Sequence, residues 1–207
     1  MNPGFLSYIL LTLSLIFIGF GWKPHAIGGA SARAALWFCL CWIVAAAVVW
    51  HAGAWSGTLA YAPLAALAAF ALRSPLPGKD AATALAFGCL LGAMYSLVQL
   101  VERVDPLAIV LHPTVDPLLL IALLAVCYTR RASIQFALLS VALIVNDAYM
   151  ALLYAEWQPA FFGGRAFQDG WWAAATAVRC ASVAATAAVV RARREGGRIR
   201  GWLRVRR

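Results

Sequence analysis

Residues 171–207 read WWAAATAVRCASVAATAAVVRARREGGRIRGWLRVRR, an apolar run followed directly by a basic one. The apolar part, residues 171–190, is long enough to cross the hydrocarbon core of a bilayer, which takes about 20 residues of helix. The last 17 positions hold eight arginines and one glutamate. Because lysine and arginine collect on the cytoplasmic side of membrane proteins, this stretch predicts a final transmembrane helix whose C-terminus lies inside.

The composition of the whole chain also favours a membrane protein. Of the 207 residues, 64% are hydrophobic and 12% are charged, whereas soluble domains average about 25% charged residues. The net charge of +9 does not indicate a nucleic-acid partner, because most of it lies in the tail next to a membrane span. There it is typical of a topology anchor, and we expect it to attract anionic lipid headgroups.

Six further apolar segments precede the last one, so the predicted fold is all-α, a seven-helix transmembrane bundle of residues 1–190 followed by a basic cytoplasmic tail of residues 191–207. Six tryptophans at segment ends are expected to lie at the membrane interfaces; they are Trp22, Trp50, Trp55, Trp157, Trp171 and Trp172. The predicted spans are residues 5–22, 34–50, 57–72, 81–101, 106–128, 136–155 and 171–190.

The distribution of lysine and arginine sets the direction of the chain. With seven spans, 14 of the 17 basic residues fall on one side of the membrane, two fall on the other and Arg179 lies inside a span. The excess of positive charge marks the cytoplasmic side. We therefore expect an outside N-terminus, an inside C-terminus and a place in the cytoplasmic membrane.

Three ionisable residues lie inside predicted spans, where each costs about 2.5 to 3.5 kcal/mol unless it has a partner. Counted from the predicted outer ends, Asp147, Arg179 and Asp116 lie about 14, 15 and 16 Å deep at the helical rise. Equal depths predict a shared polar cluster near mid-membrane, with a buried ion pair between Asp147 and Arg179. This cluster is the candidate functional site.

Two neighbours extend the predicted cluster. Asn146 adjoins Asp147, and His112 lies four residues before Asp116, on the same face if that helix is continuous. The segment contains two Asp-Pro pairs, at 105–106 and 116–117, and this pattern is typical of helix starts. The fifth span is therefore either a proline-kinked helix or a broken one, the second being a device of ion and substrate sites in transporters.

The fourth segment carries the sequence GCLLG, with Gly88 and Gly92 one turn apart. Small residues at this spacing let two membrane helices approach closely. Packing within the same chain is the first interpretation of the pattern, and a homodimer is the alternative.

Several kinds of chemistry lack their residues in this sequence. The five cysteines and three histidines do not form a zinc-binding pattern, and both lysines lie in inner connections, where a retinal could not attach. Motifs for phosphate loops, nucleophile elbows and metalloproteases are missing from the sequence. We expect no metal, no cofactor, no catalytic residue and no nucleic-acid partner.

Five short motifs resemble the YphA-like membrane proteins of endospore-forming bacilli: MNPG at 1–4, GW at 21–22, LHPTVD at 111–116, NDAYMALL at 146–153 and AFQDGWW at 166–172. The resemblance spans nearly the whole chain and implies a small polytopic membrane protein linked to the sporulating lifestyle, with no catalytic motif. The first hypothesis is therefore a non-enzymatic structural or assembly protein. A small transporter or ion-coupled carrier that uses the polar cluster is the alternative, and an intramembrane enzyme comes third.

Overall fold

The computed structural model describes residues 2–21, 31–73 and 81–205. This part of the chain folds into seven α-helices, three short strands and one turn of 3-10 helix, η1 (Pro106–Ala108). The strands are β1 (Val49–Ala52), β2 (Trp55–Thr58) and β3 (Ala160–Phe162). The helices are α1 (Phe5–Gly19), α3 (Ala32–Ala47), α4 (Tyr61–Leu72), α5 (Ala81–Val104), α6 (Val115–Tyr128), α7 (Ala132–Leu153) and α8 (Arg165–Val205).

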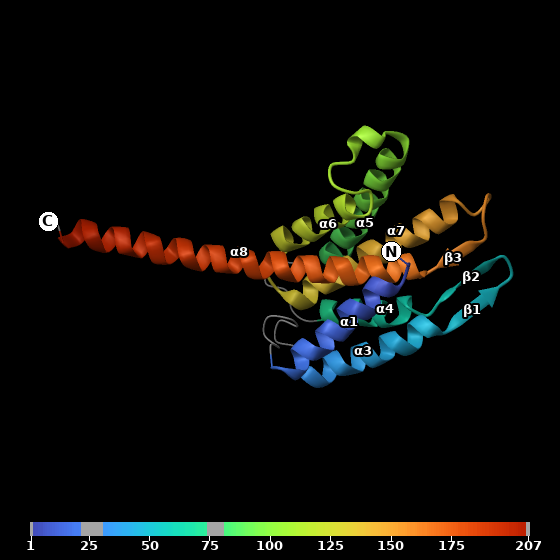
Figure 1. Ribbon diagram of the computed structural model, residues 1–207, viewed down its shortest axis with the longest axis horizontal. Helices are drawn as coiled ribbons and strands as arrows, with labels where there is room; N and C mark the ends of the chain where they lie inside the picture. The colour runs from blue at the N-terminus through green and yellow to red at the C-terminus, as the bar shows by residue number, and fades with distance from the viewer. Residues whose placement is uncertain (1, 22–30, 74–80, 206–207) are drawn as a thin grey trace.

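The bundle has two different ends. The sheet end carries the three strands, and the tail end is the opposite one, from which α8 projects far beyond the other helices (Figure 1). The chain reverses direction from each helix to the next, so its connections alternate between the two ends. The connection between α5 and α6 stands out from the bundle (Figure 1), but Arg103 at the end of α5 lies 5.0 Å over the ring of Tyr154, next to the end of α7.

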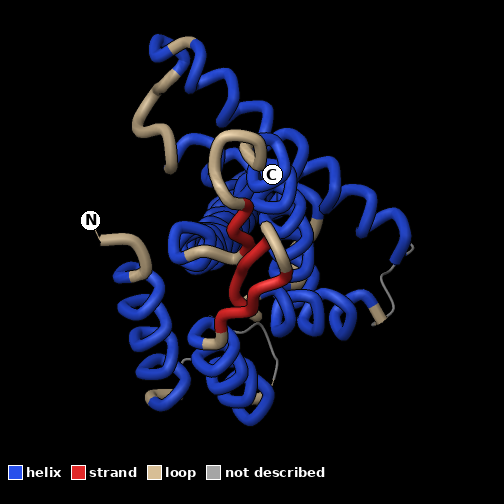
Figure 2. Tube along the Cα trace, turned by 90° about the vertical axis from the view of Figure 1, so that its right-hand side faces the viewer, coloured by secondary structure: helices blue, strands red, loops and turns tan. Residues whose placement is uncertain are grey.

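A three-stranded sheet joins two distant connections of the chain at the sheet end. β1 and β2 form an antiparallel hairpin in which Ala52 pairs with Trp55, and β2 pairs in parallel with β3. The two-residue turn between β1 and β2 begins at Gly53, whose φ of +63° suits the tight turns of hairpins. In Figure 2 the strands lie together in front of the surrounding helices.

The sheet corrects the all-α prediction, which placed residues 49–50 in the second span and residues 57–58 in the third. These residues form β1 and β2 instead. Valine and tryptophan favour strands as well as membrane helices, and apolar content alone does not separate the two. Gly53, a residue that favours tight turns, was the feature of the sequence that could have indicated a hairpin here.

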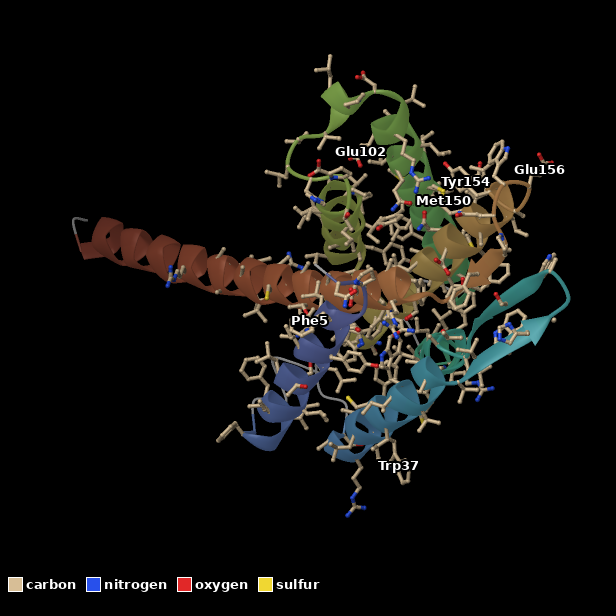
Figure 3. The ribbon with its side chains drawn as sticks, turned by 45° about the vertical axis from the view of Figure 1, so that its right-hand side comes forward. Phe5, Trp37, Glu102, Met150, Tyr154 and Glu156 are labelled. Atoms are coloured by element: carbon tan, nitrogen blue, oxygen red, sulfur yellow. The ribbon has the colours of Figure 1, made fainter. Side chains whose placement is uncertain are left out.

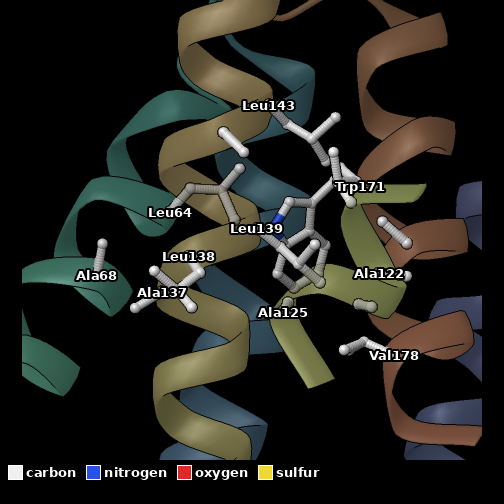
Figure 4. Packing of buried hydrophobic residues seen from close by; sticks show 14 of the residues in the cluster. Leu64, Ala68, Ala122, Ala125, Ala137, Leu138, Leu139, Leu143, Trp171 and Val178 are labelled. Carbon is white, nitrogen blue, oxygen red and sulfur yellow. The ribbon is translucent and has the colours of Figure 1, made fainter. Parts of the chain in front are cut away.

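α7 lies at the centre of the bundle and packs against α4, α5 and α8. Its buried face includes Leu138, Leu139 and Leu143, which are at most 3% exposed. Figure 4 shows Leu139 beside Trp171 of α8 and Leu64 of α4. Trp171 was expected at a membrane interface, but it is 3% exposed within this core.

α5 and α7 approach closely at two glycines. A Cβ atom built on Gly88 would lie 3.0 Å from the Cβ of Val141. A Cβ on Gly92 would lie 2.6 Å from the carbonyl oxygen of Ala142 and 2.8 Å from the Cβ of Val145. The small-residue stripe of α5 therefore faces a helix of its own chain.

The fifth predicted span is broken. Residues 106–128 were predicted to form either a proline-kinked helix or a broken one, and in the structure only the part from Val115 onward, α6, is an α-helix. Before it come η1 and an irregular segment, residues 109–114. The residue before a proline disfavours helical backbone, and both Asp105, before Pro106, and His112, before Pro113, lie outside the α-helices. Helix α6 begins at Val115, two residues earlier than an N-cap at Asp116 would require.

Three of the described helices are long and apolar enough to cross a membrane: α5, α7 and residues 165–189 of α8. The other four are apolar but have 12 to 16 residues. At 1.5 Å per residue they reach about 18 to 24 Å, less than a hydrocarbon core of about 30 Å. Trp22, the expected end of the first span, lies outside the described residues.

The contact between α5 and α7 leads to a stability prediction. We expect Gly92→Val to destabilise the protein by about 1–3 kcal/mol, because the added carbons would force two packed helices apart. Gly19→Ala is the matched control, since a Cβ at Gly19 meets nothing within 4 Å. Thermal unfolding in detergent measures both variants, and equal melting temperatures for Gly92→Val and the wild type would contradict the close packing.

Candidate functional site

The carboxylate of Asp147 joins three segments of the chain near the sheet end. Its Oδ2 accepts a hydrogen bond of 2.6 Å from the hydroxyl of Tyr61, at the start of α4. The same oxygen accepts a bond of 2.7 Å from the backbone N–H of Gly163, between β3 and α8. Hydrogen bonds to a charged acceptor are short and about twice as strong as neutral ones.

Gly163 is the centre of this arrangement. Its carbonyl oxygen accepts hydrogen bonds from the Thr58 hydroxyl at 2.7 Å and from the Gln168 amide at 3.2 Å. Its φ is +67°, and a Cβ there would lie 2.8 Å from the Thr58 hydroxyl oxygen, so the position requires glycine. Thr58, Tyr61, Asp147, Gly163 and Gln168 together form the Asp147 network.

A second carboxylate on α8 holds the start of α1. Asp169 accepts hydrogen bonds from the backbone N–H groups of Gly4 at 2.7 Å and Ser7 at 2.6 Å. The first N–H groups of a helix lack partners within the helix, and no side chain of α1 caps them. Asp169 therefore caps α1 from a distant part of the sequence, where its negative charge also suits the helix dipole.

Asn146 lies beside Asp147 in the sequence but has a different role. Its Oδ1 accepts a hydrogen bond of 2.9 Å from the hydroxyl of Ser96 on α5. The Ser96 hydroxyl also lies 3.0 Å from the carbonyl oxygen of Gly92. This buried contact lies next to the close approach of α5 and α7 and stabilises that interface.

Arg179 lies at a different level of the bundle. Its guanidinium donates to the side-chain oxygen of Gln135 at 3.2 Å. Gln135 is on α7, twelve residues before Asp147, and twelve residues of helix span about 18 Å. The predicted ion pair between Asp147 and Arg179 is therefore wrong, because Arg179 contacts α7 at Gln135, more than half the length of the helix away from Asp147.

The depths were equal only because the helix ends were misplaced. α7 ends at Leu153, so Asp147 lies six residues, or about 9 Å, from its end. α8 begins at Arg165, so Arg179 lies fourteen residues, or about 21 Å, from its start. Apolar content marks a span well but leaves its ends uncertain by several residues, and each residue shifts the depth by 1.5 Å.

His112 is exposed in the segment that leads into α6, and Asp116 is half-buried in the first turn of α6. The Asp116 carboxylate accepts backbone N–H bonds from Val110 at 2.8 Å and Leu111 at 3.0 Å. The Nδ1 of His112 accepts the backbone N–H of Thr114 at 3.2 Å. These bonds hold the broken part of the chain in shape. The structure therefore does not bring the five candidate residues together into one cluster.

Glu102 was expected in an outer connection, yet its side chain is 6% exposed at the end of α5. Figure 3 shows it near the chain that leads into α6. Within the described residues its Oε2 has no hydrogen-bond partner. Nothing in the sequence distinguished Glu102 from an ordinary helix-end acid, because its burial depends on the path of the segment that follows it.

The described residues contain no group of three histidine, cysteine or acidic side chains that could hold a metal ion. Their five cysteines are free, and Cys39 is the buried one. The described polar contacts join helices, turns and strands of the chain to one another.

The sequence of the chain matches one family of membrane proteins. A family model described as YphA-like integral membrane protein matches residues 3–193, which include the described helices from α1 to α7 and the first part of α8. The motifs with NDAYMALL and AFQDGWW supply Asp147, Gln168 and Asp169 to the contacts described above. No curated protein and no solved structure matches the chain.

A pair of mutant cycles checks the Asp147 network. Asp147→Ala should cost about 1–3 kcal/mol for each donor left without an acceptor. We expect it to couple to Tyr61→Phe, since the two side chains share one hydrogen bond, and to be additive with Arg179→Ala within about 0.5 kcal/mol. Unfolding of the single and double variants in detergent gives both coupling energies. If Asp147→Ala coupled to Arg179→Ala and not to Tyr61→Phe, Asp147 would be paired with Arg179 and its hydrogen bond to Tyr61 would be contradicted.

Proposed function

The chain belongs to the YphA-like family of integral membrane proteins, and from this premise we propose that it has a non-enzymatic, structural or assembly role in the bacterial cytoplasmic membrane. We further propose seven spans, an outside N-terminus and an inside C-terminus. Residues 1–190 form the membrane domain and residues 191–207 the cytoplasmic tail. The family resemblance suggests sporulating cells as the setting of this role.

The observation that carries the proposal is the bonding of the Asp147 carboxylate. A buried acid that transports an ion or a proton has to exchange partners during the cycle. Asp147 instead accepts bonds from Tyr61 and from the backbone of Gly163, and these donors belong to parts of the chain that must stay in place for the fold to persist. Such bonding favours a fixed structural junction.

The proposed orientation draws support from where the basic residues lie in the fold. Arg33 is the second residue of α3, Arg73 follows α4 and Arg130 precedes α7, all at the tail end. Arg103 and Arg165 lie at or near the sheet end. Since positive charge marks the cytoplasmic side, the tail end corresponds to the inside of the cell.

One observation favours the alternative of an ion-coupled carrier. Glu102 is a buried acid whose Oε2 lacks a hydrogen-bond partner among the described residues. Buried ionisable groups in membrane proteins often mark ion or proton paths. Because this is one carboxylate at the end of one helix, the structural role remains the better supported function.

The proposed topology can be tested by labelling in whole cells. In a background without native cysteines, Trp157→Cys should react with a membrane-impermeant maleimide added outside, and Trp202→Cys should react only after the cells are opened. Positive charge keeps the tail on the cytoplasmic side, so we expect this difference at full labelling. Labelling of residue 202 in intact cells would contradict both the orientation and the number of spans.

The structural role and the carrier differ in a flux measurement. With the purified protein in liposomes loaded with a pH-sensitive dye, we expect no proton flux above empty liposomes under a pH or sodium gradient. Glu102→Gln should then change nothing in the assay. A flux that the wild type shows and a stably folded Glu102→Gln variant loses would favour the carrier.

A further inference from the structure

A long apolar groove runs between α1, α3, α4, α7 and α8. It has a volume of about 630 Å³, within the range of about 300–1,000 Å³ that small-molecule sites occupy. Several of its residues are exposed, including Phe70 at 74% and Phe17 at 42%, so the groove opens on the surface of the bundle. Six aromatic residues line it: Phe17, Phe38, Phe70, Phe136, Trp171 and Trp172.

One charged side chain, Arg179, lies among the described residues that line this groove. Gln135 is fully buried, donates to the carbonyl oxygen of Thr129 at 2.7 Å, and turns its own side-chain oxygen toward the guanidinium of Arg179 at 3.2 Å. The guanidinium is therefore held in place by a neutral amide that is itself fixed. A planar guanidinium suits the oxygens of a phosphate.

The guanidinium is near the tail end of the bundle. Gln135 lies three residues after the start of α7 at Ala132, or about 5 Å along the helix. On α8 the lining of the groove runs from Trp171 to Ala184. From Arg179 the groove therefore extends eight residues, or about 12 Å, toward the sheet end and five residues, or about 8 Å, toward the tail end. One leaflet provides about half of the 30 Å hydrocarbon core, or about 15 Å. The part of the groove on the sheet side of Arg179 thus has about the depth of one leaflet, with the charge at its headgroup side.

We propose that the groove binds one anionic phospholipid from the leaflet at the tail end, with its phosphate on Arg179 and an acyl chain against the aromatic rings. The apolar lining matches the chain, and the single cation matches the phosphate. Binding here is distinct from attraction of lipids to the basic tail, because Arg179 lies on the bundle itself. The assignment holds whichever side of the membrane the tail end faces.

The lining favours a lipid over a second helix. Where two helices of this chain pack closely, Gly88 and Gly92 bring the backbones together, as is usual between membrane helices. In the groove, large rings alternate with small residues such as Ala175 and leave an uneven channel. A flexible acyl chain can follow such a surface, whereas the rigid side of a helix would leave gaps.

Native mass spectrometry of the purified protein in detergent tests the proposal, with phosphatidylglycerol as the probe and phosphatidylcholine as its neutral comparison. We expect one molecule of phosphatidylglycerol to bind in preference to phosphatidylcholine. Arg179→Gln should weaken phosphatidylglycerol binding at least tenfold, because it removes the charge but keeps a polar group. Arg130→Gln is the matched control: it removes an exposed arginine near the same end, outside the groove, and should leave binding unchanged.

A second variant guards against misfolding of Arg179→Gln. Thr176 is exposed and lines the groove, so Thr176→Trp should fill the channel and exclude the acyl chain while the core stays intact. Equal binding of the two lipids by the wild type, unchanged binding in a folded Arg179→Gln or Thr176→Trp variant, or a lipid-free dimer that both variants abolish would each overturn the proposal.

Discussion

A buried polar group inside a membrane cannot form hydrogen bonds with water, so it needs a partner within the protein. In this protein the carboxylate of Asp147 is such a partner. Every unsatisfied group in hydrocarbon costs several kcal/mol, so irregular backbone can persist at such a depth only where side chains satisfy it. Asp147 and Thr58 do so for the N–H and the carbonyl of Gly163. The short sheet, the start of α8 and the start of α4 all take their positions from this one residue.

The parts of the fold that sequence alone could predict are those governed by local pattern. Apolar length predicted where helices occur, and each of the seven predicted segments overlaps one α-helix of the structure. Spacing of small residues marked Gly88 and Gly92, which lie against α7. Both signals depend on neighbouring positions of one helix, so no knowledge of the remaining chain was needed to read them.

The candidate site could not be predicted in the same way, because its contacts join residues far apart in the sequence. Asp147 and Arg179 were placed at one depth by counting from helix ends that were several residues off. Tyr61, the actual partner of Asp147, is 86 residues away, in a different predicted span. Trp171 was expected at a membrane interface, and only the packing of Leu139 and Phe38 around it shows that it belongs to the core.

The unequal lengths of the helices have a consequence for the surrounding bilayer. α5 and α7, with 24 and 22 residues, reach about 36 and 33 Å, whereas α4 and α6 reach about 18 and 21 Å. Beside the long helices the bilayer can keep its full hydrocarbon thickness, whereas beside the short helices it has to become thinner. Hydrophobic mismatch of this kind sorts proteins among membranes of different thickness. The hydrophobic thickness of this protein therefore differs around its circumference. Beside α4 and α6 it matches a thinner bilayer than beside α5 and α7.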